Sequence, residues 1–309
     1  MRIVFMGTPD FAVPSLERLI ADGHEIVGVF TQPDKPQGRK MILTPSEVKQ
    51  AALGHGLAVY QPETFKNGAC EELLRTLAPE LIVVVAYGKL LPKYVLEMPR
   101  YGCINVHGSL LPRWRGAAPI QWSVIAGDTH AGVTTMQMDV GLDTGDMLLT
   151  YETPVGARET AGELYERLSY AGAELLSETI AQLQAGTLTP VKQDDAQSCY
   201  AAMLDKKIAL IDWYRPAREL DCLIRGLNPW PIALTTLHGE RMKVFAAVPV
   251  EGQGVPGEVL DADVKRGLTV ACGEDALCIT ELQMVGGKRM HAGDYLRGHA
   301  VAPGVRLGE

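Results

Sequence analysis

The chain opens with Met1-Arg2-Ile3-Val4-Phe5-Met6-Gly7-Thr8-Pro9-Asp10, an apolar run that ends in a glycine and a proline. An apolar run of this length predicts a buried strand, and a proline soon after it is typical of the entry to a helix. We expect that helix at Val13–Ala21. A buried strand followed at once by a helix is the first half of a βαβ unit.

The same alternation continues over residues 1–190. Further strands are predicted at Ile26–Phe30, Leu81–Ala86, Ile104–Val106 and Val133–Met138, and helices at Ser46–Gly54, Ala69–Leu77, Ala117–Ile125 and Thr160–Leu183. Runs that are apolar on both faces are typical of parallel strands covered by helices. The pattern therefore predicts an α/β domain at 1–190 with a doubly wound, mostly parallel open sheet.

The pattern changes in the last third of the chain. A polar stretch without periodicity predicts a linker at 191–206 and a second domain at 207–309. This domain has one predicted helix, at Pro216–Arg225, and four predicted strands, at Ile232–Leu237, Met242–Val250, Gly267–Cys272 and Leu277–Leu282. Short strands joined by glycine-rich turns predict a small β-barrel.

Composition excludes several classes of protein. Hydrophobic residues make up 47% of the 309 residues, and no apolar run approaches the roughly 20 residues that span a bilayer. The N-terminus lacks the regions of a signal peptide, so we expect a cytoplasmic protein without a membrane segment. The six cysteines show no CxxC spacing and are read as free structural thiols.

The charge distribution leaves nucleic acid open as a partner. A net charge of −8 argues against phosphate binding when the chain is taken as a whole. Residues 206–309, however, hold 13 basic and 13 acidic side chains, so the acidic excess lies entirely in 1–205. A neutral second domain can still carry a basic face.

Two nucleotide-binding motifs are missing. Of the three glycines in GxGxxG, only Gly7 follows the first strand, so we expect no dinucleotide. There is also no GxxxxGK[ST] phosphate loop, and no second His or Cys lies at ligand spacing near His107, so we expect no metal.

The candidate site lies where a predicted strand ends in Asn105-Val106-His107-Gly108. Residues two apart on a strand point to the same face, and open α/β sheets bind ligands at the carboxyl ends of their strands. The turn-rich stretch that follows another strand contains Asp143, a carboxylate partner for His107. The alternatives are a hydrogen-bonded pair without a catalytic role for Asn105 and His107, and a turn cap for Asp143.

These three residue types suit attack by an amine on a carbonyl-like carbon. An Asn amide donates to the developing oxyanion, and a His beside a carboxylate moves protons near neutral pH. Ser109 is the only nearby candidate for a side-chain nucleophile, and there is no GxSxG elbow around it.

The residues around this site resemble a known signature. The stretch 105–120, read together with Met136-Gln137-Met138-Asp139-Val140-Gly141-Leu142-Asp143-Thr144-Gly145, is similar to the active site of the 10-formyltetrahydrofolate-dependent formyltransferases. Gly7–Ala12, Gln32–Arg39 and Asn228–Pro231 resemble, in particular, the members of that family that act on methionyl initiator tRNA.

The resemblance implies a mechanism and a set of ligands. It implies Asn105, His107 and Asp143 as the catalytic residues of direct formyl transfer from 10-formyltetrahydrofolate to the methionyl α-amino group. It places the folate against the backbone around Val85, Ala86, Tyr87 and Gly88, against Ser109, Leu110, Leu111 and Pro112, and against the loop Asp139–Asp143.

The resemblance also implies how the tRNA is held, and we expect the enzyme to be a monomer. The loop Thr31–Pro45 would enter the acceptor end, and the second domain would be an OB-like barrel that binds the tRNA backbone. The residues expected to contact tRNA are Arg39, Lys40, Lys206, Lys207, Arg218 and Arg225. The rival readings are transfer to another amine, such as a sugar nucleotide or glycinamide ribonucleotide, hydrolysis of the formyl folate, and an RNA-binding module without catalysis.

Overall fold

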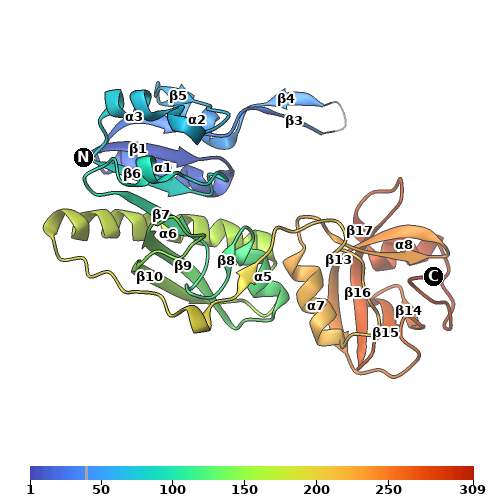
Figure 1. Cartoon of the computed structure of the whole chain (residues 1–309). Helices are drawn as coiled ribbons and strands as arrows, with labels where there is room; N and C mark the ends of the chain where they lie inside the picture. Colours follow the sequence, from blue (N-terminus) through green and yellow to red (C-terminus); the bar gives the residue numbers. More distant parts are fainter. Residues whose placement is uncertain (39–40) are drawn as a thin grey trace. The chain divides into compact units, whose positions relative to one another are not determined.

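The computed structural model describes residues 1–38 and 41–309, and only the backbone of Gln37. The chain divides into two units (Figure 1). The first comprises Met1–Pro119, His130–Thr153 and Tyr165–Ala201, and the second comprises Ile120–Thr129, Pro154–Leu164 and Ala202–Glu309. The second unit thus includes two short segments from the middle of the chain, a division that no linker composition indicates.

A seven-stranded sheet forms the centre of the first unit, in the order β10-β9-β7-β6-β1-β2-β5. Its strands are β1 (Arg2–Gly7), β2 (Glu25–Phe30), β5 (Val59–Tyr60), β6 (Leu81–Val85), β7 (Cys103–His107), β9 (His130–Gln137) and β10 (Met147–Pro154). The pairs from β5 to β7 are all parallel, whereas β9 runs antiparallel to β7. The predicted mostly parallel open sheet is confirmed.

Helices cover both faces of this sheet, as a doubly wound fold requires. The helices of the first unit are α1 (Val13–Ala21), α2 (Glu47–Gly54), α3 (Glu71–Leu77), α4 (Lys93–Leu96) and, from Tyr165 on, α6 (Ala161–Ala185), whereas α5 (Pro119–Ile125) belongs almost entirely to the second unit. On one face, Val84 of β6 belongs to an apolar cluster with Leu74 of α3 and Val95 of α4. On the other face, Gly172 of α6 packs close to Val106 of β7.

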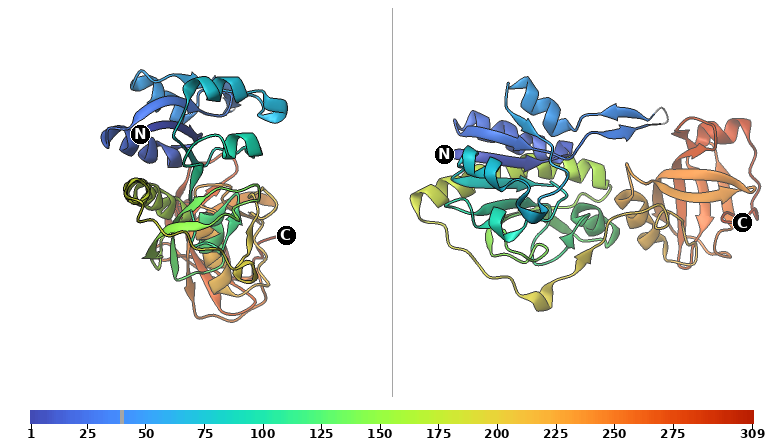
Figure 2. Two further views of the ribbon diagram at one scale, coloured as in Figure 1. Left: turned by 60° about the vertical axis from the view of Figure 1, so that its left-hand side comes forward. Right: turned by 45° about the horizontal axis from the view of Figure 1, so that its top comes forward.

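The segment Thr31–Pro45, expected to be a loop, contains a short hairpin. Strand β3 (Lys35–Gln37) pairs antiparallel with β4 (Ile42–Thr44), and the hairpin extends away from the body of the first unit (Figures 1 and 2). Lys49 of α2 fixes the start of the hairpin, because its Nζ donates to Asp34 Oδ2 at 2.7 Å. Pro36 and Gly38 suggested an irregular loop, but strands of three residues leave no periodic signal.

An antiparallel sheet forms the second unit, in the order β12-β13-β16-β15-β14, with β17 paired to β16. The strands are β12 (Ala233–Leu237), β13 (Glu240–Val250), β14 (Val259–Asp263), β15 (Gly267–Ala271), β16 (Ala276–Met284) and β17 (Met290–His291). The C-terminal segment hydrogen-bonds near both edges, since Leu307 bridges to Leu237 and Arg306 bridges to Glu258.

Two helices pack against the strands of the second unit. Helix α7 (Ala217–Gly226) agrees with the predicted helix, whereas α8 (Ala292–Gly298) lies in a region predicted to contain strands only. The α8 sequence, Ala-Gly-Asp-Tyr-Leu-Arg-Gly, contains two glycines and so gives a weak helix signal. No described helix combines the length and the apolar character that a membrane span requires.

Candidate active site

Strand β7 brings Asn105 and His107 to one face of the sheet, and Val106 points to the opposite face toward α6. Asn105 is 8% exposed and His107 6% exposed, so both polar tips lie at the buried end of a strand. Within the described residues the Asn105 amide has no hydrogen-bond partner. The atoms of this side-chain amide are not fully enclosed, so its N–H donors are open to a ligand.

The imidazole of His107 lies between two acceptors. Its Nε2 is 3.0 Å from the carbonyl oxygen of Trp114, and its Nδ1 is 3.8 Å from Asp143 Oδ1. Because a carbonyl oxygen can only accept, Nε2 carries a proton, and Nδ1 faces the carboxylate. A second proton on Nδ1 would therefore produce an imidazolium stabilised on both sides. The 3.8 Å separation is that of an ion pair rather than of a hydrogen bond.

Asp143 is held in an unusual backbone conformation in the loop between β9 and β10. Its φ of +55° lies in the left-handed region, which residues other than glycine seldom adopt. Its Oδ2 accepts the backbone N–H of Gly116 at 2.9 Å, which leaves Oδ1 directed at His107. The structure thus brings together the three residues predicted as catalytic.

Close packing fixes the same loop through Gly145. A β-carbon on Gly145 would lie 1.7 Å from the backbone oxygen of Gln137, so the backbone would have to move. We expect Gly145→Ala to lower the free energy of unfolding by on the order of 3 kcal/mol and to reduce activity. Denaturant titration and thermal melting measure this. The control is Gly54→Ala at the end of α2, where nothing lies within 4 Å and we expect no loss of stability.

The predicted folate segment Ser109–Pro112 is held by local hydrogen bonds. The Ser109 hydroxyl donates to the carbonyl of Arg113 at 2.7 Å, and the Thr134 hydroxyl donates to the carbonyl of Ser109 at 2.7 Å. The backbone N–H of Leu111 donates in turn to the Thr134 oxygen. Ser109 is only 3% exposed, so its hydroxyl maintains the loop and is poorly placed to act as a nucleophile.

Another predicted folate segment follows β6. Ala86 has a φ of +46° and is exposed, whereas the Tyr87 ring is buried against Phe65. Gln32 Nε2 donates to the carbonyls of both Tyr87 and Gly88, each at 3.1 Å. The role of Gln32 in holding this segment was not predicted, because the two stretches are far apart in the sequence.

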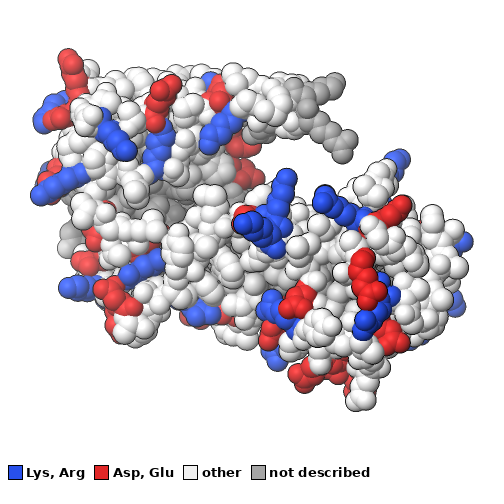
Figure 3. Space-filling view, turned by 45° about the vertical axis from the view of Figure 1, so that its right-hand side comes forward, with Lys and Arg blue, Asp and Glu red and all other residues white. Residues whose placement is uncertain are grey.

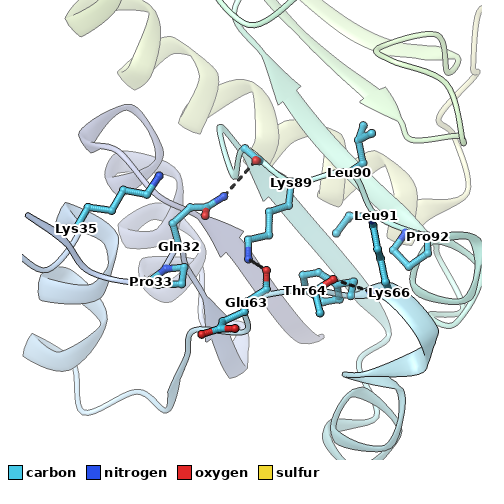
Figure 4. Close-up of a pocket in the computed structure, with 12 residues that line it drawn as sticks. Gln32, Pro33, Lys35, Glu63, Thr64, Lys66, Lys89, Leu90, Leu91 and Pro92 are labelled. Atoms are coloured by element: carbon cyan, nitrogen blue, oxygen red, sulfur yellow. Dashed lines mark hydrogen bonds between the residues drawn. The ribbon is translucent and has the colours of Figure 1, made fainter.

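A cavity of about 640 Å³ opens beside this second segment (Figure 4). Three stretches of the chain line it. They are Gln32, Pro33 and Lys35 in the first, Glu63–Lys66 in the second and Gly88–Pro92 in the third. Lys89 crosses one wall, where its Nζ donates to the carbonyl of Glu63 at 2.6 Å (Figure 4). The residues that line the cavity include Gly88 of the predicted folate site. They do not include Asn105, His107 or Asp143.

The basic residues predicted to contact tRNA are placed differently from one another. Arg39 and Lys40 lie outside the described residues. Lys206, Lys207 and Arg218 are exposed. Figure 3 shows both basic and acidic side chains on the surface of each unit.

Arg225 is the exception among these basic residues. Its side chain is 11% exposed, and its Nε donates to Asp221 Oδ2 at 2.9 Å. Its Nη1 donates to the carbonyl of Glu159. Arg225 therefore links α7 to residue 159 within the second unit. Its guanidinium already donates hydrogen bonds to protein groups.

Within the described residues, the buried Cys103 thiol is not a nucleophile and no cluster of side chains suits a metal ion. All six thiols are free, and burial raises the pKa of Cys103 to about 12. A thiol with such a pKa is not a nucleophile at neutral pH. Residues 1–38 and 41–309 contain no cluster of three or more His, Cys, Asp or Glu side chains able to hold a metal ion.

Comparison with known proteins covers nearly the whole chain. The family model for formyl transferase matches residues 1–180, and the model for the formyl transferase C-terminal domain matches residues 203–300. The methionyl-tRNA formyltransferase of Geotalea uraniireducens is 51% identical over 100% of this chain and 98% of its own. That of Stutzerimonas stutzeri is 53% identical over 100% of this chain and 99% of its own.

Solved structures share the fold at low sequence identity. An N-formyltransferase from Helicobacter canadensis, in complex with folinic acid and dTDP-3-aminofucose, is 18% identical with a TM-score of 0.66 and covers 90% of this chain and 98% of its own. HypX from Aquifex aeolicus, in complex with tetrahydrofolic acid, is 17% identical with a TM-score of 0.64 and covers 96% of this chain and 47% of its own.

Proposed function

The chain belongs to the formyl transferase family, and on that premise we propose that it transfers the formyl group of 10-formyltetrahydrofolate to methionine carried by initiator tRNA. The acceptor is the methionyl α-amino group, and the product serves the initiation of translation. The observation that carries this proposal is the match of the whole chain to methionyl-tRNA formyltransferases that are 51% and 53% identical over 98% and 99% of their own length. We further propose a cytoplasmic monomer that needs neither a metal nor a dinucleotide.

In the proposed reaction the amine attacks the formyl carbon directly, and a C–N bond forms as the carbonyl electrons move to oxygen. The Asn105 amide donates a hydrogen bond to the resulting oxyanion, and protonated His107 stabilises it by charge. Asp143 holds the imidazolium, and water beside it carries the amine proton away. The bond between the formyl carbon and N10 of the folate then breaks, and N10 takes up a proton.

We propose that the folate lies along two of the predicted segments, Ala86–Gly88 and Ser109–Pro112, with the 640 Å³ cavity beside the first of them. The exposed backbone at Ala86 and Gly88 supports this placement, because backbone groups recognise a pterin ring through hydrogen bonds. Leu90, Leu91 and Pro92 give the cavity an apolar wall suited to an aromatic ring.

The test is a formylation assay with the purified chain and 10-formyltetrahydrofolate. Methionyl initiator tRNA, free methionine, an amino sugar nucleotide and glycinamide ribonucleotide are supplied as separate acceptors. Formyl incorporation into the charged tRNA alone is the expected result. Incorporation into a small amine, or loss of formate with no acceptor labelled, would replace the proposed function by one of its rivals.

The exposed lysines at the start of the second domain give a separate prediction. We expect Lys206→Ala/Lys207→Ala to raise KM for the charged tRNA with little change in kcat, because phosphate contacts position the nucleic acid without joining the chemistry. The slope of log affinity against log salt should fall by about 2, one for each contact. Lys265→Ala, an exposed lysine outside the predicted set, is the control. Equal salt slopes in the double variant and the wild type would exclude both lysines from the interface.

A further inference from the structure

Residues 193–201 were assigned from sequence to a linker but belong to the first unit. They contact the loops that hold His107 and Asp143, which are called the catalytic pair below. The segment contains the buried Gln193, a short 3-10 helix (Asp195–Gln197) and strand β11 (Tyr200–Ala201). Gln193 is 6% exposed, whereas its neighbours Lys192 and Asp194 are exposed. A single buried glutamine in an otherwise exposed polar stretch points to a specific role.

The side chain of Gln193 uses its full hydrogen-bonding capacity. Its Nε2 donates to the carbonyl of Asp143 at 2.9 Å and to the carbonyl of Gly145 at 2.7 Å. Its Oε1 accepts from Arg115 Nε at 3.0 Å and Nη2 at 2.8 Å. An amide has two N–H donors and one oxygen with two lone pairs, so all four positions are filled.

These bonds join the two sides of the catalytic pair. Asp143 and Gly145 belong to the loop that carries the carboxylate, and Arg115 begins strand β8 (Arg115–Gly116). Strand β8 follows Trp114, whose carbonyl contacts His107 Nε2, and it contains Gly116, whose N–H donates to Asp143 Oδ2. Gln193 therefore ties the backbone of Asp143 to the segment that orients both the carboxylate and the imidazole.

The C-terminal end of residues 193–201 also supports β8, through backbone hydrogen bonds. Strand β11 pairs parallel with β8, and the N–H of Arg115 donates to the carbonyl of Cys199 at 2.9 Å. The N–H of Trp114 donates to Cys199 Sγ at 3.2 Å. A glutamine at one end and a strand at the other thus hold Trp114–Gly116 in register with the Asp143 loop.

We propose that Gln193 is a positioning residue for formyl transfer, which keeps Asp143 directed at His107 in the left-handed backbone conformation that this geometry needs. The proposal rests on the proposed function, since it concerns the same catalytic pair. The hydrogen bonds of Gln193 go to backbone carbonyls of the loop and to Arg115, and none goes to His107 or to the carboxylate of Asp143, so Gln193 acts through the backbone of the loop. A displacement of about 1 Å in such a group typically costs about 100-fold in rate.

The test is Gln193→Glu, which keeps the size of the side chain and its acceptor for Arg115 but removes both donors to the loop. We expect kcat to fall about 10- to 100-fold, with KM for the folate and for the charged tRNA unchanged, because positioning acts on the transition state. Gln197→Glu is the matched control. It makes the same chemical change on an exposed side chain four positions along, whose Nε2 bonds only to Asp194 within the described residues.

A double-variant comparison separates positioning from general destabilisation. In an Asp143→Asn background, Gln193→Glu should cost little further activity, because the group that it positions has lost its charge. A wild-type kcat for Gln193→Glu, or an equal loss in both backgrounds, would overturn the proposal. All rates are measured with whichever acceptor the wild-type protein formylates, so an error in the proposed acceptor is seen first and separately.

Discussion

His107→Ala and Asp143→Ala should each lower kcat for formyl transfer by about 10²- to 10⁴-fold while leaving the affinity for the charged tRNA nearly unchanged. The reason is geometric. His107 Nε2 bonds to the Trp114 carbonyl and Nδ1 faces Asp143. Because an acceptor faces each ring nitrogen, a positive charge on the imidazole is stabilised. Removal of either partner takes away charge that stabilises the transition state, and neither residue belongs to the set predicted to contact tRNA.

Three further variants serve as controls for this prediction. Asp143→Asn keeps an oxygen that can accept the Gly116 N–H at the site of the present 2.9 Å bond, and it removes only the charge. It should lose nearly as much activity as Asp143→Ala with a smaller loss of stability. His55→Ala removes a surface histidine paired with Glu17 and should retain wild-type rates. The double variant His107→Ala/Asp143→Ala should be little slower than the single ones, since residues that act as a unit are not additive. A single variant with wild-type kcat would contradict the mechanism.

The parts of the fold that were predictable from sequence are those with a local periodic signal. Val13–Ala21 was predicted as a helix and forms α1 with the same bounds, and the buried runs near Ile3 and Leu81 form β1 and β6. The antiparallel direction of β9 could not be predicted, because an apolar run has the same pattern in either direction.

The catalytic residues were predictable for a different reason. Asn105 and His107 are two positions apart on one strand, so their shared face follows from strand geometry alone. Asp143 needed more, namely a turn-rich stretch after a strand together with the family signature. Its actual placement depends on a φ of +55° and on contacts that no short-range pattern encodes.

The residues that were missed act across long distances in the sequence. Gln193 lies 50 positions from Asp143, in a stretch whose polar composition indicated a linker. Gln32 is 56 positions from Gly88, and the sequence marked it as part of the loop Thr31–Pro45 and of a stretch that resembles the family, with no role in holding residues 87 and 88. In both cases the residue acts through a single side-chain amide. Its role can be seen only once the fold places that amide within hydrogen-bonding distance of particular backbone carbonyls. Burial of Gln193, at 6% exposed, is the feature that separates it from the solvated residues around it.

Asn105→Ala should lower kcat by about 10²- to 10³-fold, the loss expected when one donor to an oxyanion is removed. Asn105 is 8% exposed, and no group in the described residues bonds to its amide, so the amide donors are oriented by the strand and not consumed by the protein. Donors already in place need no rearrangement as charge develops on the formyl oxygen. KM for 10-formyltetrahydrofolate should change little, because the interaction strengthens only in the transition state.

Asn105→Asp distinguishes oxyanion stabilisation from simple packing. The aspartate has the same shape, so a packing role would be preserved, and the activity of this variant would exceed that of Asn105→Ala. If the amide stabilises an oxyanion, a carboxylate in its place lacks the N–H donors and adds a negative charge that repels the intermediate, so Asn105→Asp should be the slower of the two. Parallel measurement of kcat for both variants, with binding of tetrahydrofolate as the check on folding of the site, decides between these roles. A faster Asn105→Asp would remove Asn105 from the oxyanion site and leave His107 as the only residue proposed to stabilise that charge.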